Sequence, residues 1–233
     1  MKALLIPLRP PWIHAQYFEE LDSTQSVAAG QIAAGGDLRG VALWAERQTA
    51  GRGRGARTWI SRPGGLYVTA GLPELWTGDC RWLGWVPLIA AMACVRSARE
   101  RWAIPAMLKW PNDVWADGRK LAGMLGETGP ASSEGRWVLI GMGLNWINAA
   151  AEEGRAAGYD ACAIGDYDEN LDPDDRLGFL ENWLAGVAVE MAKLAAAPEQ
   201  RSEDLRREAG AMLLQRGEDV VLEHTEEGRI AGR

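Results

Sequence analysis

The chain has 233 residues, of which 47% are hydrophobic and 24% are charged, and these values exclude a wholly disordered protein. Its formal net charge is -7, so we expect no binding to DNA. Cys80, Cys94 and Cys162 are far apart and form no CxxC pair, which excludes a disulfide framework and a zinc site. The start, MKALLIPLRPPW, has no long apolar segment, so we expect a cytoplasmic protein without a membrane span.

The first half of the chain alternates strand and helix patterns. Asp22 or Ser23 is a suitable N-cap for a helix over residues 25–34, and the run 81–102 has apolar residues at helical spacing. The expected elements are strand Gln16–Leu21, helix Gln25–Ala34, strand Val41–Glu46, strand Leu66–Leu72 and helix Arg81–Trp102.

The second half begins with strands and continues with helices. Asp172 is a suitable N-cap, and Pro173 suits the first position of a helix. The expected elements are strands Met107–Trp115, Lys120–Glu127 and Trp137–Trp146, helices Pro173–Ala197 and Glu199–Leu214, strand Asp219–His224 and a turn at Glu226-Glu227-Gly228.

A loop rich in glycine and arginine follows the strand that ends at Glu46. From Gly51 to Trp59 it reads Gly-Arg-Gly-Arg-Gly-Ala-Arg-Thr-Trp, a concentration of positive charge in an acidic protein. Glycine allows backbone amides to approach a ligand, and arginine donates a planar fork of hydrogen bonds to carboxylates and phosphates. We therefore predict an anion-binding loop.

The dipeptide Asp117-Gly118 predicts a tight β-hairpin. A two-residue turn there pairs Ala116 with Arg119, Trp115 with Lys120, Asp113 with Ala122 and Asn112 with Gly123. This register places Lys120 and Asp113 on one face of the hairpin, within reach of one bound group, and leaves room for a ligand beside Gly123. An exposed hairpin with a solvated lysine is the alternative.

The strand Val138–Asn145 carries Gly141 and Gly143 within an apolar run. Glycines at alternate positions leave one face of a strand without side chains, which is unfavourable unless something packs there. A flat ligand and a neighbouring element of the protein are both compatible with this pattern.

Taken together, these stretches resemble the biotin protein ligase family, within the biotin and lipoate ligase superfamily. The matches are Asp22-Ser23-Thr24; Gln48-Thr49-Ala50-Gly51-Arg52-Gly53-Arg54 with Trp59; Lys109-Trp110-Pro111-Asn112-Asp113 with Lys120-Leu121-Ala122-Gly123; and Ile140-Gly141-Met142-Gly143-Leu144-Asn145. They lie in the same order as in the family and span residues 22–145.

The resemblance implies an α/β (α+β) fold related to class II aminoacyl-tRNA synthetases, with a mixed β-sheet and helices on one face. The implied domains are a catalytic domain over residues 1–215 and the start of a small C-terminal β domain over residues 216–233, which we expect to be either truncated or divergent. The implied reaction joins biotin to ATP as biotinyl-5'-AMP, with Mg2+, and then transfers biotin to a lysine of the biotin carboxyl carrier domain of a carboxylase. The resemblance allows a homodimer.

The resemblance also implies roles for residues in these motifs. Lys120, Arg52 and Arg54 are the catalytic cations, and Asp113 is the Mg2+ ligand. Biotin contacts Ser23, Thr24, Gln48, Gly51, Arg52, Lys120, Gly123, Gly141 and Gly143. ATP contacts Arg54, Arg57, Trp59, Asn112, Asp113 and Asn145.

The chain departs from the family pattern in its loop and after Asn145. The family loop usually continues Arg-Arg-Gly-Arg after the second glycine, whereas Gly53 is followed here by Arg54-Gly55-Ala56-Arg57. After Asn145 the family commonly has a stretch similar to Ala-Thr-Ser-Leu, whereas this chain has Ala161-Cys162-Ala163-Ile164. We expect the loop change to affect closure and retention of the adenylate more than ligand binding.

Three other functions compete with a biotin ligase. A lipoate ligase would use the same adenylate chemistry, but its usual motif, Arg-Arg-x-Ser-Gly-Gly-Gly, is absent. A binding or regulatory paralogue would hold biotin or a nucleotide and transfer poorly. An RNA-binding loop of the Arg-Gly type would normally lie in a more basic and disordered setting.

Overall fold

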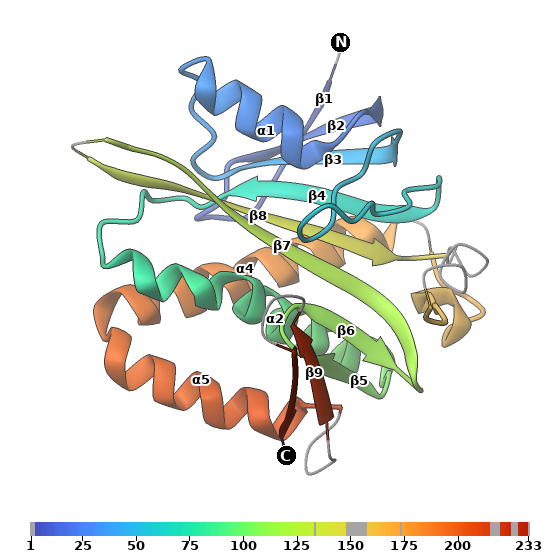
Figure 1. The fold of residues 1–233 in the computed structure, drawn as a ribbon. Coiled ribbons are helices and arrows are strands. Elements are labelled where there is room, and N and C mark those ends of the chain that lie inside the picture. The colour runs from blue at the N-terminus through green and yellow to red at the C-terminus, as the bar shows by residue number, and fades with distance from the viewer. Residues whose placement is uncertain are drawn as a thin grey trace.

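A single mixed sheet of eight strands organises the described part of the chain (Figure 1). The computed structural model describes residues 3–132, 134–147, 158–172, 174–214, 220–224 and 228–232. The strand order is β1-β2-β3-β4-β8-β7-β6-β5, with β2 and β3 parallel and the other neighbours antiparallel. The predicted fold class, with its mixed sheet, is confirmed.

The strands of this sheet are β1 (Leu4–Pro7), β2 (His14–Leu21), β3 (Val41–Gln48), β4 (Gly65–Gly71), β5 (Ala106–Lys109), β6 (Asp113–Ala116), β7 (Arg119–Ser132) and β8 (Gly135–Asn145). The helices are α1 (Thr24–Ala33), α2 (Val86–Trp102), α4 (Asp175–Ala196) and α5 (Pro198–Met212), with short 3-10 helices η1 (Cys80–Trp85) and η2 (Ile164–Asp166). Most predicted strands and helices therefore lie within a few residues of their expected bounds.

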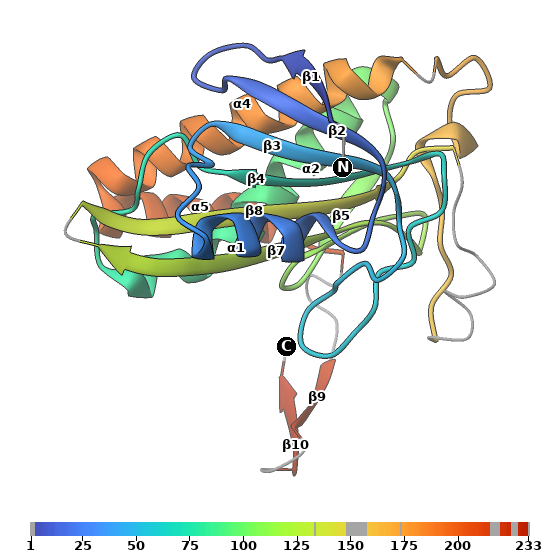
Figure 2. The same ribbon diagram turned by 90° about the horizontal axis from the view of Figure 1, so that it is seen from above.

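The two faces of the sheet have separate apolar cores. Along β3, Ala42 and Trp44 point into the core that includes α2 and α4, whereas Val41, Leu43 and Ala45 point into the core beneath α1. This alternation is the period of two that a strand with both faces buried requires. Figure 2 shows α2, α4 and α5 on one side of the sheet and α1 on the other. The expectation of helices on one face thus holds for all of these except α1.

Proline explains where two predicted elements differ from the structure. The predicted helix 81–102 is η1 followed by α2, and α2 begins at Val86 with Pro87 in its first turn, where the missing N–H costs little. The predicted single strand 107–115 is wrong. It is the antiparallel pair β5 and β6, separated by a turn that contains Pro111, because proline cannot donate to a strand ladder. Strand β1 was not predicted.

The C-terminal residues form a separate antiparallel pair, β9 (Val220–His224) and β10 (Gly228–Gly232). Helix α4 begins at Asp175 with Asp174 as its N-cap, so the prediction of Asp172 is wrong. Pro173, Asp219 and residues 226–227 of the predicted turn lie outside the described residues, as does the proposed domain boundary at 215/216. Among the helices described, none is both long and apolar enough to cross a membrane.

The cysteines offer a test of the packing. Cys80 is exposed, whereas burial raises the pKa of Cys94 to about 12 and that of Cys162 to about 11. We expect a thiol reagent at pH 8 to modify Cys80 rapidly in the native protein and to reach the other two only after denaturation. Peptide mass spectrometry identifies the labelled residue, and rapid native labelling of Cys94 would contradict the packing of α2 on the sheet.

Candidate active site

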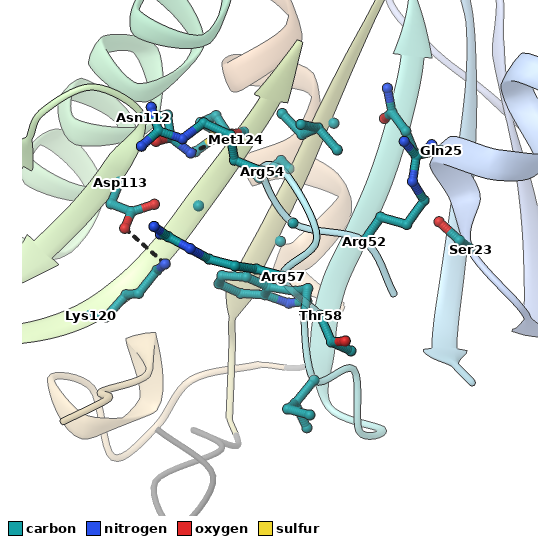
Figure 3. A pocket seen from close by; sticks show the side chains of 18 of the residues that line it. Ser23, Gln25, Arg52, Arg54, Arg57, Thr58, Asn112, Asp113, Lys120 and Met124 are labelled. Carbon is teal, nitrogen blue, oxygen red and sulfur yellow. Dashed lines mark hydrogen bonds and ion pairs between the residues drawn. The ribbon is translucent and has the colours of Figure 1, made fainter. Parts of the chain in front are cut away.

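A cavity of about 850 Å³ lies on the α1 side of the sheet, between β4, β7, β8 and the loop Gly51–Trp59 (Figure 3). Its size suits a ligand at the larger end of the usual range. The predicted site residues that line it are Ser23, Thr24, Gln48, Arg52, Arg54, Arg57, Trp59, Asn112, Asp113, Lys120, Gly123, Gly141 and Gly143. Gly51 and Asn145 do not line it. Residues 100 positions apart in sequence are thus brought to one site by the sheet.

One end of the cavity is polar, because the start of α1 meets β3 and β4 there. Ser23 is the N-cap of α1, and its hydroxyl accepts a hydrogen bond from the Ser26 amide. The backbone amide and the hydroxyl of Thr24 both donate to Gln48 Oε1, at 2.8 and 3.1 Å. The amide nitrogen of Gln48 donates in turn to Ser61 Oγ at 2.6 Å. These bonds fix the orientation of both side chains before any ligand enters.

Two residues of this polar end were not predicted from the sequence. Thr69 Oγ1, on β4, lies 2.9 Å from Thr24 Oγ1 and 3.0 Å from Gln25 Oε1. Gln25 closes the cavity over Gly141, since a Cβ added to that glycine would lie 2.7 Å from Gln25 Oε1. The available signal for Thr69 is that it is the polar residue in the buried apolar run Leu66–Leu72.

Glycines form the floor of the cavity, and the indole of Trp59 lies directly on it. Gly123 on β7 pairs with Gly143 on β8. A Cβ on Gly143 would lie 2.4 Å from the Trp59 ring, and one on Gly123 would lie 2.9 Å from it. Side chains at these two positions are therefore excluded by contact with a flat group. In this structure that flat group is a residue of the protein.

The hairpin of β6 and β7 places a lysine and an aspartate at the other end of the cavity. Its turn residues are as predicted, and Trp115 pairs with Lys120 and Ala116 with Arg119. Beyond them a β-bulge shifts the register, and Asp113 pairs with Gly123. The predicted pairs of Asp113 with Ala122 and of Asn112 with Gly123 are therefore wrong. Lys120 Nζ nevertheless lies 2.8 Å from Asp113 Oδ2, as the prediction of a shared face required.

The two predicted asparagines stabilise main chain around the cavity. Asn112 Nδ2 donates to the Met124 carbonyl at 2.8 Å, and Met124 N donates to the Asn112 carbonyl at 2.8 Å. Asn145 is buried away from the cavity, and its amide donates to the carbonyls of Lys120 and Cys162 at 3.3 and 2.9 Å. Asn145 therefore holds the backbone of Lys120 in place, and the structure gives it no direct exposure to the cavity.

Two aromatic rings lie beside Lys120, that of Trp59, which was predicted, and that of Tyr159, which sequence reasoning missed. Lys120 Nζ lies 5.2 Å from the ring centre of Tyr159 and 5.2 Å from that of Trp59, so its charge faces two aromatic rings. Burial and, next, the charge of Asp113 raise the pKa of Tyr159, whereas Arg57 lowers it. The backbone amide of Lys120 donates to the Asp160 carbonyl at 2.8 Å, which joins this segment to β7.

The three arginines of the loop point to different parts of the cavity. The loop is a small hairpin, with Arg52 bridged to Thr58 and the Gly53 amide donating to the Arg57 carbonyl at 2.8 Å. Figure 3 shows Arg52 extending toward Gln25, and Arg54 and Arg57 extending toward Asn112 and Asp113. Gly55 has a φ of +66°, in the left-handed region that glycine adopts without strain.

Gly51 lies where the ends of this loop meet. Its carbonyl accepts a hydrogen bond from Trp59 N at 2.9 Å, and a Cβ at this position would lie 2.4 Å from the Trp59 carbonyl oxygen. The glycine is therefore required for the loop to close on itself. It shapes the site without lining the cavity.

The match to a known family covers the residues that build this site, apart from the segment at Tyr159. Residues 17–145 match the model of the biotin/lipoate A/B protein ligase family. The chain is 36% identical to the biotin-[acetyl-CoA-carboxylase] ligase of Mycobacterium tuberculosis over 146 residues, which cover 61% of this chain and 52% of that protein. It is 30% identical to the ligase of the same name from Paracoccus denitrificans over 189 residues, covering 76% of this chain and 75% of that protein.

The fold has solved counterparts as well. The biotin protein ligase from Aquifex aeolicus in complex with biotin and ATP superimposes with a TM-score of 0.73 at 28% sequence identity, covering 94% of this chain and 85% of that chain. The chain spans about half the length of the Mycobacterium ligase.

The contact between Gly143 and Trp59 can be tested by adding one methyl group. We expect Gly143→Ala to push the Trp59 indole off the floor, because the added Cβ would lie 2.4 Å from the ring. The measurement is the fluorine NMR signal of Trp59 in protein labelled with fluorotryptophan, assigned with Trp59→Phe. Gly210→Ala is the matched control, because its Cβ has nothing within 4 Å. An unmoved Trp59 signal in Gly143→Ala would contradict the contact.

Proposed function

Because the chain belongs to the biotin/lipoate A/B protein ligase family, we propose that it is a biotin protein ligase. In this proposal the enzyme first joins the carboxylate of biotin to the α-phosphate of ATP and then transfers biotin to a lysine of a carboxylase carrier domain. The observation that carries the proposal is one cavity with hydrogen-bonding groups at one end, a glycine floor, and a lysine with loop arginines at the other end.

The polar end of the cavity favours biotin over lipoate. The ureido ring of biotin offers a carbonyl acceptor and N–H donors, whereas the dithiolane ring of lipoate offers neither. Thr24, Gln48 and Thr69 bring hydroxyl and amide groups to this end, and such groups would lose hydrogen bonds against an apolar ring. The glycine floor provides space for a flat ring system once Trp59 moves aside.

The cations at the other end suit both chemical steps. In the first step a biotin carboxylate oxygen bonds to the α-phosphorus, and the bond from that phosphorus to the pyrophosphate oxygen breaks. In the second step a lysine amine bonds to the acyl carbon, AMP leaves, and the amine loses a proton. Lys120 is held 2.8 Å from Asp113, so its ammonium group is already positioned to stabilise the negative oxygens that both steps create.

The loop arginines add to this charge and cover the reacting groups. Arg54 and Arg57 extend toward the same end as Lys120 (Figure 3), where they can bind phosphate oxygens with two parallel hydrogen bonds each. A loop closed over the cavity also excludes water from the mixed anhydride, which water would otherwise hydrolyse.

Asp113 can hold the Mg2+ that accompanies ATP. Among the described residues that line the cavity, Asp113 is the only one that carries a carboxylate. Mg2+ in nucleotide sites is usually bound by one or two carboxylates together with phosphate oxygens, so this residue fits the ion. When bound, Mg2+ supplies positive charge that neutralises the phosphates. A homodimer, the absence of DNA binding and a cytoplasmic location stay predictions from the sequence.

The activity can be tested with purified protein, ATP, Mg2+ and either labelled biotin or labelled lipoate, with and without an apo carrier domain. We expect pyrophosphate release with biotin and labelled carrier when the domain is present. Pyrophosphate without carrier labelling would instead indicate a binding paralogue, and activity with lipoate alone would refute the biotin ligase.

The role of Lys120 can be tested in the same assay. We expect Lys120→Ala to slow adenylate formation by about 100-fold or more, the usual cost of removing a group that stabilises a developing charge. Binding of biotin, measured by calorimetry, should remain detectable because the polar end is intact. Lys193→Ala removes an exposed lysine on α4 and serves as the control. Unchanged adenylation in Lys120→Ala would remove this residue from catalysis.

A further inference from the structure

Arg52 and Glu127 form an ion pair that joins the loop to the sheet. Both terminal nitrogens of Arg52 bond to the carboxylate, with Nη1 3.1 Å from Oε2 and Nη2 2.5 Å from Oε1. Two parallel hydrogen bonds of this kind fix the orientation of both groups. Glu127 lies on β7, four residues beyond the floor glycine Gly123, and no motif in the sequence pointed to it.

This ion pair is the charged contact that anchors the loop hairpin. Within residues 53–57 two backbone hydrogen bonds stay inside the loop: Gly53 N donates to the Arg57 carbonyl, and Arg57 N donates to the Arg54 carbonyl. The side chains of Arg54 and Arg57 are exposed. Among the described residues from Gly51 to Trp59, only Arg52 has a side chain paired with a carboxylate of the sheet.

The same carboxylate is also connected to the polar end of the cavity. Gln25 Nε2 donates to Glu127 Oε2 at 3.0 Å. The oxygen of the same amide, Gln25 Oε1, lies 3.0 Å from Thr69 Oγ1. Thr69 Oγ1 in turn lies 2.9 Å from Thr24 Oγ1. A continuous chain of hydrogen bonds thus runs from the loop arginine to the residues that would hold the ureido ring.

We propose that Glu127 is a positioning residue that holds the glycine-arginine loop closed through Arg52, and that Gln25 couples this closure to a ligand at Thr24 and Gln48. The identity of that ligand as biotin rests on the proposed function, whereas the anchoring of the loop does not. The duties of the loop arginines then differ, because Arg52 is neutralised by Glu127 while Arg54 and Arg57 face the phosphate end.

The rate of trypsin cleavage after Arg54 and Arg57 measures how tightly the loop is anchored, because the protease cleaves a loop that has detached from the sheet faster than one held to it. We expect Glu127→Gln to speed cleavage at these two sites about five-fold without any ligand, the effect of losing an ion pair of this exposure. Asp175→Asn is the matched control, since it removes a similarly exposed pair with Arg101, between α2 and α4. Equal cleavage of Glu127→Gln and the wild type would overturn the proposal.

A charge exchange separates the anchor from a general effect on folding. Arg52→Glu and Glu127→Arg should each speed cleavage, and the two together should restore resistance, because the pair is rebuilt in the opposite sense. Two single effects that simply add in the double variant would show that these residues act independently, and would overturn the proposal. Thermal unfolding of each variant confirms that the sheet itself is intact.

The coupling through Gln25 needs biotin in the same experiment. Added biotin should slow cleavage of the wild type, and this protection should be reduced in Gln25→Ala and in Glu127→Gln. Full protection of both variants would overturn the coupling. With ATP present, biotinyl-adenylate should leave Glu127→Gln about five-fold faster than it leaves the wild type.

The outcomes distinguish this inference from the proposed function. A protein that never forms an adenylate, but whose loop is loosened by Glu127→Gln, would refute the ligase and support the anchor. A protein that forms and retains the adenylate equally well with and without Glu127 would support the ligase and refute the anchor.

Discussion

The β-bulge at Leu121 is the constraint on which the geometry of the cavity depends. In a regular strand, residues three positions apart point to opposite faces, yet Lys120 and Gly123 both line the cavity. The register shift leaves Leu121 without a partner in β6. This extra residue interrupts the alternation of side chains between Lys120 and Gly123. Lys120 and the glycine floor can therefore share one face, while Leu121 and Ala122 are fully buried in the core on the other side.

The sequence could predict the members of this site better than their arrangement. Glycine at alternate positions, the Asp117-Gly118 turn and the N-cap Ser23 are local signals with local causes, and the structure has each of them as expected. The bulge is not local, because it depends on which side chains the core accepts. Register beyond Trp115 was therefore predicted one residue out. Thr69, Gln25 and Glu127 were missed because each is an ordinary polar residue until the fold brings it to the cavity.

The loop illustrates how a departure from a family pattern can suit the fold. In the family an arginine is usual where this chain has Gly55, and that residue stands in the left-handed region with open space around it. A larger residue would fit there sterically but would strain the backbone. Of the remaining arginines, Arg52 is paired with Glu127 of the sheet, whereas Arg54 and Arg57 extend toward Asn112 and Asp113.

The position of Trp59 has a calorimetric consequence. Its indole already covers Gly123 and Gly143, so this part of the floor is in contact with an apolar group before any ligand arrives. A flat ring that takes this place exchanges one protein contact for another and removes less apolar surface from water than the size of the cavity implies. The heat-capacity change of binding should then be less negative than for an open cavity of about 850 Å³.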